Sequence, residues 1–153
     1  MSGRRRRGCG PIDANTTTNN IRVDIGETCT VNTGIIAAAN FSVSGTLIVS
    51  GTVTGNIGAA SKVILDGGIV NGNVKLKTAG GELEVTDNDG TINGNLSLPN
   101  GGTLTGGGGD ILTINGDAKC GVAPTDNLDE AVVFGPKKNA NGDGEDKGGV
   151  CGI

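Results

Sequence analysis

A five-residue phrase that occurs four times sets the organisation of this chain. It reads Val-Thr-Gly-Asn-Ile, Val-Asn-Gly-Asn-Val, Ile-Asn-Gly-Asn-Leu and, in a weaker form, Ile-Asn-Gly-Asp-Ala, at residues 53–57, 70–74, 92–96 and 114–118. Successive copies start 17, 22 and 22 residues apart. Self-similarity at such a period is typical of a stacked repeat, in which each copy marks one coil.

The phrase favours a parallel β-solenoid over a meander of hairpins. Gly-Asn pairs suit hairpin turns, but a meander does not require them to return at nearly constant spacing. In a solenoid each coil lies on the previous one at ~4.8 Å, so equivalent residues stack. Val53 and Ile57 then fill the interior, and Gly55 leaves room where the coil bends. The fourth position forms an outward ladder whose side-chain amides bond to the coils above and below, at Asn56, Asn73, Asn95 and Asp117.

Short strand patterns separated by Gly, Asn and Asp fill residues 21–123, without an amphipathic helix pattern. We therefore predict an all-β chain with one parallel β-helix body over 21–123. Residues 1–20 are predicted to be a basic, polar arm, because Gly, Pro and a Thr/Asn tract interrupt regular structure. In residues 124–153 we predict a short helix through about Val133, capped by Asp126, that closes the last coil. A Gly-rich acidic tail follows.

The composition argues against most enzyme chemistry. The chain has 30 Gly, two Phe, and no Trp, Tyr or His. Without His, neither a Ser-His-Asp triad nor a Cys-His pair can form, and most zinc sites are excluded. Asp87 and Asp89 are the nearest to a carboxylate pair, and they fit a solvated turn. We predict a non-enzymatic protein with no catalytic residues, no metal site and no cofactor.

Two stretches have weak calcium-binding features. Residues 139–144 resemble the start of an EF-hand loop, but Val150 stands where a bidentate Glu is needed. Residues 106–114 resemble half of a calcium β-roll repeat, but Asp110 comes one residue early and nothing repeats in tandem. A calcium- or carbohydrate-binding β-helix is therefore a weaker alternative.

The basic residues are concentrated at the start of the chain. Four arginines against Asp13 give residues 1–20 a net charge of +3, and the remainder carries −7. The arginine cluster predicts docking on an acidic protein surface, another copy included, or else a solubilising tip. Nucleic-acid binding is disfavoured because no aromatic or further basic residue accompanies the cluster. Its members are Arg4, Arg5, Arg6 and Arg7.

Four cysteines lie in the tails and near the ends of the body: Cys9, Cys29, Cys120 and Cys151. Several coils at ~4.8 Å separate Cys29 from Cys120, which exceeds the ~7 Å Cα limit for a bridge. Bridges would join Cys9 to Cys29 and Cys120 to Cys151, or one molecule to the next, with reduced buried thiols as the alternative. No apolar run is long enough for a membrane span, and no signal peptide is evident. We expect assembly in the cytoplasm, or in a virion.

The extended phrase resembles a refrain of the bactofilins. Gly-Thr-Val-Thr-Gly-Asn-Ile at 51–57, Gly-Ile-Val-Asn-Gly-Asn-Val at 68–74 and Gly-Thr-Ile-Asn-Gly-Asn-Leu at 90–96 look like their Gly-x-Val-x-Gly-Asn-Ile pattern. The resemblance covers roughly residues 44–118. It implies a right-handed β-helix that polymerises end to end without nucleotide. The four cysteines, the arginine cluster and the 22-residue spacings depart from that pattern. Asn/Thr/Gly-rich solenoids are also similar to phage and virus structural proteins.

These features together predict a structural role. The first expectation is a self-assembling subunit of a filament or lattice, with copies of itself as partners. The alternative is a virion protein, such as a capsid decoration, spike or fibre, that docks on other virion proteins through its terminal arms. An open solenoid end favours assembly, because it exposes unpaired backbone groups.

Overall fold

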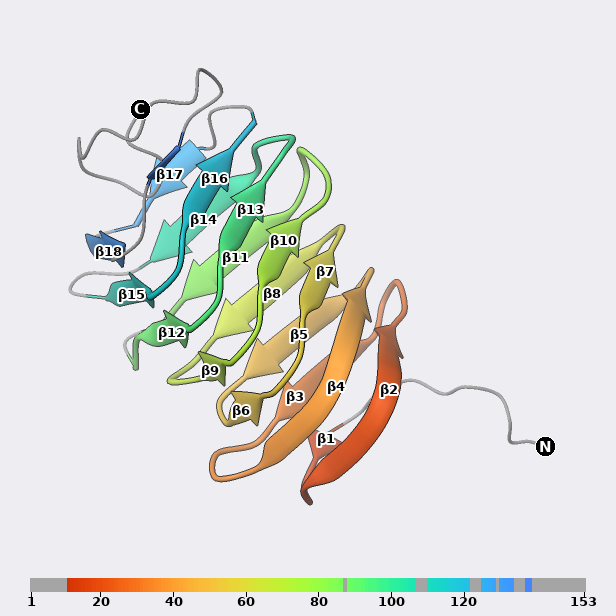
Figure 1. Cartoon of the computed structure of the whole chain (residues 1–153). Helices are drawn as coiled ribbons and strands as arrows, with labels where there is room; N and C mark the ends of the chain where they lie inside the picture. Colours follow the sequence, from red (N-terminus) through yellow and green to blue (C-terminus); the bar gives the residue numbers. More distant parts are fainter. Residues whose placement is uncertain are drawn as a thin grey trace.

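The protein is a parallel β-solenoid (Figure 1). The computed structural model describes residues 11–86, 88–106, 110–121, 125–128, 130–133 and 137–138. All strand pairs among them are parallel, and none of these residues is helical. The described part of the chain therefore contains no helix that could cross a membrane. The predicted all-β parallel solenoid is confirmed.

One side of the solenoid is a seven-stranded sheet, named sheet A here, to which each coil contributes one strand. Outward and buried residues alternate along these strands, as the period of two requires. In stacking order the strands are β1 (Pro11–Ile12), β3 (Thr28–Val31), β5 (Thr46–Val49), β8 (Lys62–Leu65), β11 (Glu82–Val85), β14 (Thr103–Gly106) and β17 (Thr125–Asn127).

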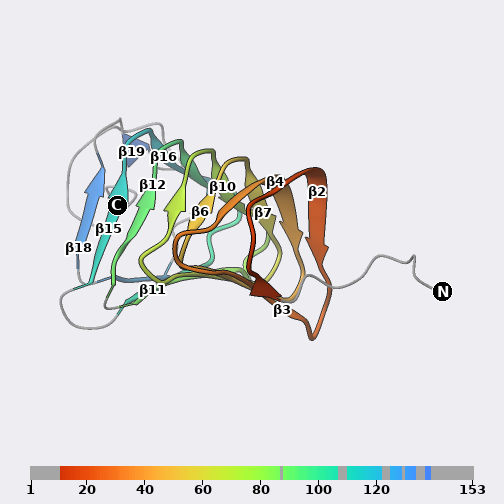
Figure 2. The same ribbon diagram turned by 90° about the horizontal axis from the view of Figure 1, so that it is seen from below.

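The remaining strands form a twelve-stranded sheet that divides into two branches. Its first two coils each contribute one long strand, β2 (Thr16–Val23) and β4 (Ile36–Val43). Later coils bend and contribute two short strands. The first branch holds β6 (Thr52–Val53), β9 (Ile69–Val70), β12 (Gly90–Ile92), β15 (Ile111–Ile114) and β18 (Glu130–Val133). The second branch holds β7 (Ile57–Ala59), β10 (Val74–Leu76), β13 (Leu96–Leu98), β16 (Ala118–Cys120) and β19 (Lys137–Lys138). Figure 2 shows the coils as successive layers from β2 to β18.

The glycine of the repeated phrase lies at the corner between the two branches. There the backbones of neighbouring coils approach so closely that a side chain has no room. A Cβ atom on Gly94 would lie 2.6 Å from the carbonyl carbon of Gly72 and 2.6 Å from Asn73 Oδ1. The glycines at the other three corners also meet backbone of the previous coil, namely Gly55, Gly72 and Gly116.

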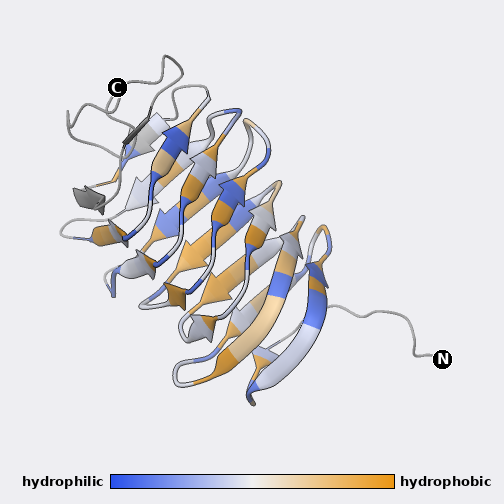
Figure 3. Ribbon diagram, in the orientation of Figure 1, coloured by the Kyte–Doolittle hydropathy of each residue, from blue (hydrophilic) through white to orange (hydrophobic). Residues whose placement is uncertain are grey.

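The interior is filled by columns of aliphatic side chains in register. The first and last residues of each phrase form two such columns, and all are buried: Val53, Val70, Ile92 and Ile114, then Ile57, Val74, Leu96 and Ala118. Figure 3 shows apolar bands recurring at the same place on successive strands. Stacked branched side chains therefore supply the thin core that the aromatic-poor composition predicts.

Strand pairing continues beyond the predicted body of residues 21–123 at both ends. β1 and the first half of β2 lie within the predicted N-terminal arm and pair with β3 and β4. At the other end, the predicted helix through Val133 is wrong. The chain there forms β17 and β18, which pair with β14 and β15. Pairing with the exposed edge of the preceding coil outweighs local helix propensity.

Candidate functional surfaces

An asparagine ladder runs along the corner between the branches. The four predicted ladder residues are all exposed or partly exposed there, and Asn40 adds a member one coil earlier. Each side-chain oxygen accepts a hydrogen bond from the backbone N–H of the next member. The donor–acceptor distances are 2.9 Å for Asn40–Asn56, 2.9 Å for Asn56–Asn73, 2.8 Å for Asn73–Asn95 and 2.7 Å for Asn95–Asp117. The side-chain oxygens thus bond to the backbone of the following coil, whereas bonds to the coils both above and below were predicted.

A second ladder lies beside the first branch. Asn93 Nδ2 donates to Asn71 Oδ1, and Asn115 Nδ2 donates to Asn93 Oδ1, both at 2.6 Å. These bonds join side chain to side chain. The sequence signal was the second position of the phrase, which is Asn in three of four copies. We did not predict this ladder, because an outward ladder at the fourth position already accounts for a repeated asparagine.

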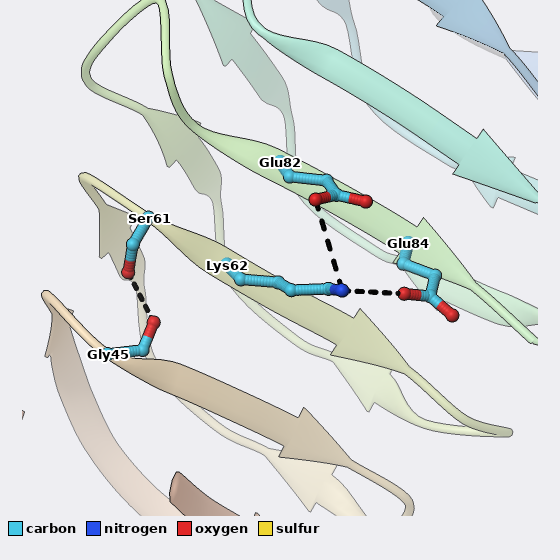
Figure 4. Close-up of polar contacts among 5 residues, drawn as sticks. All are labelled: Gly45, Ser61, Lys62, Glu82 and Glu84. Atoms are coloured by element: carbon cyan, nitrogen blue, oxygen red, sulfur yellow. Dashed lines mark hydrogen bonds and ion pairs between the residues drawn. The ribbon is translucent and has the colours of Figure 1, made fainter. Parts of the chain in front are cut away.

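The outward face of sheet A carries a three-residue ion cluster (Figure 4). Lys62 Nζ lies 3.1 Å from Glu84 Oε1 and 3.9 Å from Glu82 Oε1, on the neighbouring strand. The hydrogen bond to Glu84 raises the pKa of Lys62 above its ordinary value of 10.5, and the charge of Glu82 adds to that effect. Next to the cluster, Ser61 donates a hydrogen bond to the carbonyl of Gly45. These contacts join neighbouring coils and leave Lys62 neutralised.

Acidic residues line the corner between sheet A and the first branch. Asp66 Oδ1 accepts hydrogen bonds from Thr86 Oγ1 at 2.6 Å and Asn88 Nδ2 at 2.8 Å. The bond from Thr86 is the main cause that lowers the pKa of Asp66 below 3.8, followed by the bond from Asn88. Asp89 has a positive φ of 68° and accepts the Ile111 N–H at 2.9 Å. Its Asp87 neighbour lies outside the described residues. These carboxylates act as turn-stabilising acceptors.

Among the described residues, no group of three or more His, Cys, Asp or Glu side chains could hold a metal ion. Asp110 is buried beneath the corner. The EF-hand-like stretch at 139–144 and Val150 lie outside the described residues, as do Arg4, Arg5, Arg6 and Arg7. The expectations for those segments stay predictions.

The first coil presents a strand with only one described partner. β2 pairs with β4 and with no other strand in the described chain. The pairing register shifts between Thr17 and Asn20, which leaves Thr18 and Asn19 in a bulge. The interior of the coil is nevertheless covered, because Ile12 and Val23 are buried. Directly after β2, Ile25 is 86% exposed in a turn, although Ile21, Val23 and Ile25 alternate with polar residues as in a half-buried strand.

Cys29 and Cys120 are both buried and disulfide-bonded. They lie on β3 and β16, four coils apart, so at ~4.8 Å per coil they are too distant to bridge each other. Cys9 and Cys151 lie outside the described residues, so the pairing of each stays a prediction. Two of the four cysteines are thus placed at opposite ends of the solenoid.

Comparisons with known proteins give no relative. Neither protein-family models, nor curated proteins, nor solved structures match this chain. The resemblance to bactofilins and to virion solenoids therefore rests on the repeated phrase and the solenoid architecture. Function has to be argued from the surfaces themselves.

Proposed function

We propose that this chain is a non-enzymatic structural subunit that assembles through the first coil of its solenoid. The observation that carries the proposal is the β2 edge, which has no described partner on its outer side. Unpaired N–H and C=O groups on such an edge pair readily with a strand from another chain.

The first coil presents a possible partner with the backbone groups of β2 rather than with apolar surface. Its interior residues Ile12 and Val23 are already buried, so association there is driven mainly by strand pairing. The bulge at Thr18 and Asn19 limits a continuous new pairing to the segments on either side of it. Exposed Ile25 supplies an apolar contact next to the second of these segments. A second copy of the chain is the simplest partner that presents matching coils.

Electron microscopy and analytical ultracentrifugation test the proposal. We expect the wild type to form polymers or larger oligomers, and the double variant Thr18→Lys/Ile25→Lys to remain monomeric, because lysines on an edge oppose pairing. The control Thr33→Lys/Ala79→Lys adds the same charge at exposed turns and should assemble normally. Assembly that is unchanged in the first variant, or absent from the wild type, would refute the proposal.

The disulfides favour a second candidate, a virion structural protein. Disulfide bonds persist in particles and outside cells but are reduced in most cytosols. Disulfide-bonded Cys29 and Cys120 therefore support assembly on a particle over a cytoplasmic filament. Discrete oligomers that form without reductant and bind a particle surface would support this candidate. Long filaments that form equally well in reductant would count against it.

A further inference from the structure

The outward face of the second branch carries two exposed lysines in one column, Lys75 and Lys119. Strand register places Lys75 of β10 beside Ser97 of β13, and Ser97 beside Lys119 of β16. In the other direction the register leads from Lys75 through Gly58 and Ser42 to Arg22, which forms an ion pair with Asp24 at 3.7 Å. Hydrophilic bands recur on β2, β10 and β16 (Figure 3).

A third ammonium group, that of Lys77, reaches this column over a glycine. A Cβ atom on Gly58 would lie 2.8 Å from Lys77 Cε and 3.4 Å from Lys77 Nζ. Because Gly58 has no side chain, Lys77 can lie over it, and Gly58 is the register partner of Lys75 on the neighbouring strand. The small residues of the column thus leave space that lysine side chains occupy or border.

No ion pair forms at Lys75, Lys77 or Lys119 among the described residues. Lys62 on sheet A differs, since two glutamates neutralise it. The second branch is therefore a positive surface on a chain of net charge −4. Neighbouring lysines at ~4.8–10 Å repel one another, and an anion between them removes that repulsion.

A groove of about 430 Å³ lies along this column, lined by Asn73, Val74, Lys75, Asn95, Leu96, Ser97, Asp117 and Lys119. The ladder fixes the orientation of its amides. The oxygens of Asn73 and Asn95 accept backbone N–H groups, so their Nδ2 groups stay available as donors. Two ammonium groups, two amides and the Ser97 hydroxyl therefore offer donors, against the single carboxylate of Asp117. That lining suits an anionic group.

We propose that the groove and the lysine column bind an anionic polysaccharide along the solenoid axis. Its carboxylate or sulfate groups would lie between Lys75 and Lys119, which are two coils or ~10 Å apart. The amide and hydroxyl donors suit sugar oxygens. Nucleic acid fits less well, because the column has no aromatic side chain on which bases could stack, and Phe41 is buried. This binding is separate from assembly through β2.

The test is titration calorimetry of the full chain at low salt, with a heparin-derived oligosaccharide for sulfate and an oligogalacturonate for carboxylate. Lys75→Ala/Lys119→Ala should weaken binding about tenfold, the effect of two exposed ion pairs. Lys75→Glu/Lys119→Glu should abolish it, and Ser97→Lys should strengthen it. The control Lys62→Ala, on the opposite side, should bind as the wild type does.

Three outcomes would overturn the inference. They are unchanged affinity in Lys75→Ala/Lys119→Ala, equal binding of neutral dextran, and tighter binding of single-stranded DNA of equal charge than of either glycan. Binding of only one of the two glycans would support the site and identify its acidic group. Electron microscopy of the same variants separates this test from that of assembly, because neither lysine lies on β2 and assembly should be unchanged.

Discussion

The corner glycines make the sharpest prediction of stability. In Gly94→Ala the new methyl group would lie 2.6 Å from the Gly72 carbonyl carbon and from Asn73 Oδ1. Carbon atoms normally approach to only ~3.5 Å, so the coils must separate locally by ~1 Å. Backbone atoms cannot rotate away as a flexible side chain could.

That separation breaks two hydrogen bonds between the coils. Gly94 N–H donates to the Gly72 carbonyl at 3.1 Å, and Asn95 N–H donates to Asn73 Oδ1 at 2.8 Å. With ~1 kcal/mol net for each bond and residual strain on the same scale, we expect a loss of ~3 kcal/mol in the free energy of unfolding. For a chain of this size, this lowers the thermal midpoint by ~10 °C.

Thermal and urea unfolding, followed by circular dichroism, measure the effect. Gly80→Ala is the matched control, because its nearest contact would be Thr78 Oγ1 at 3.9 Å and its φ is not positive. The control should change stability by less than ~1 kcal/mol. If Gly94→Ala and Gly80→Ala unfold at the same midpoint, close backbone stacking is not the reason for glycine at the corner.

Three further perturbations test individual contacts. Asp66→Asn should make the stability of the fold less sensitive to acid. Because the pKa of Asp66 is lowered, its carboxylate stabilises the fold above pH 3.8, and this effect is lost as the pH falls through the lowered pKa. The unfolding midpoints of wild type and variant should therefore converge in acid. Lys62→Met should cost at most ~1 kcal/mol at low salt and nothing measurable at ~1 M salt, since the pair is partly exposed and is screened by salt. Asn95→Ala should cost ~1 kcal/mol and speed hydrogen exchange of the Asp117 amide, while that of Asn56 keeps its wild-type rate.

The sequence predicted the solenoid because its signal repeats. A residue type that returns in every coil, such as the glycine of the phrase, reports the same environment several times. The hydrogen-bond partner of each ladder amide was not predictable, because an Asn side chain can bond equally well to a side chain or to backbone. Only the structure shows that Asn73 bonds to backbone and Asn71 to a side chain.

The ends of the solenoid were less predictable because they lack that repetition. Residues 16–20 of β2 are mostly exposed and so show no alternation of apolar and polar side chains, although they lie against β4. The Asp- and Glu-containing stretch before Val133 has local helix signals, but β15 offers it an edge to pair with. The basic column was also missed, because Lys75 and Lys119 are 44 positions apart and meet only through strand register.

The corner ladder gives the stack a direction. Every side-chain oxygen from Asn40 to Asn95 accepts an N–H that comes later in the sequence. A chain that emerges from the ribosome amino end first therefore completes each acceptor before its donor has been synthesised. Each finished coil is thus a template for the next one. A circular permutant that starts within the body would have to fold at least one coil before the preceding coil, with its acceptor oxygen, has been synthesised.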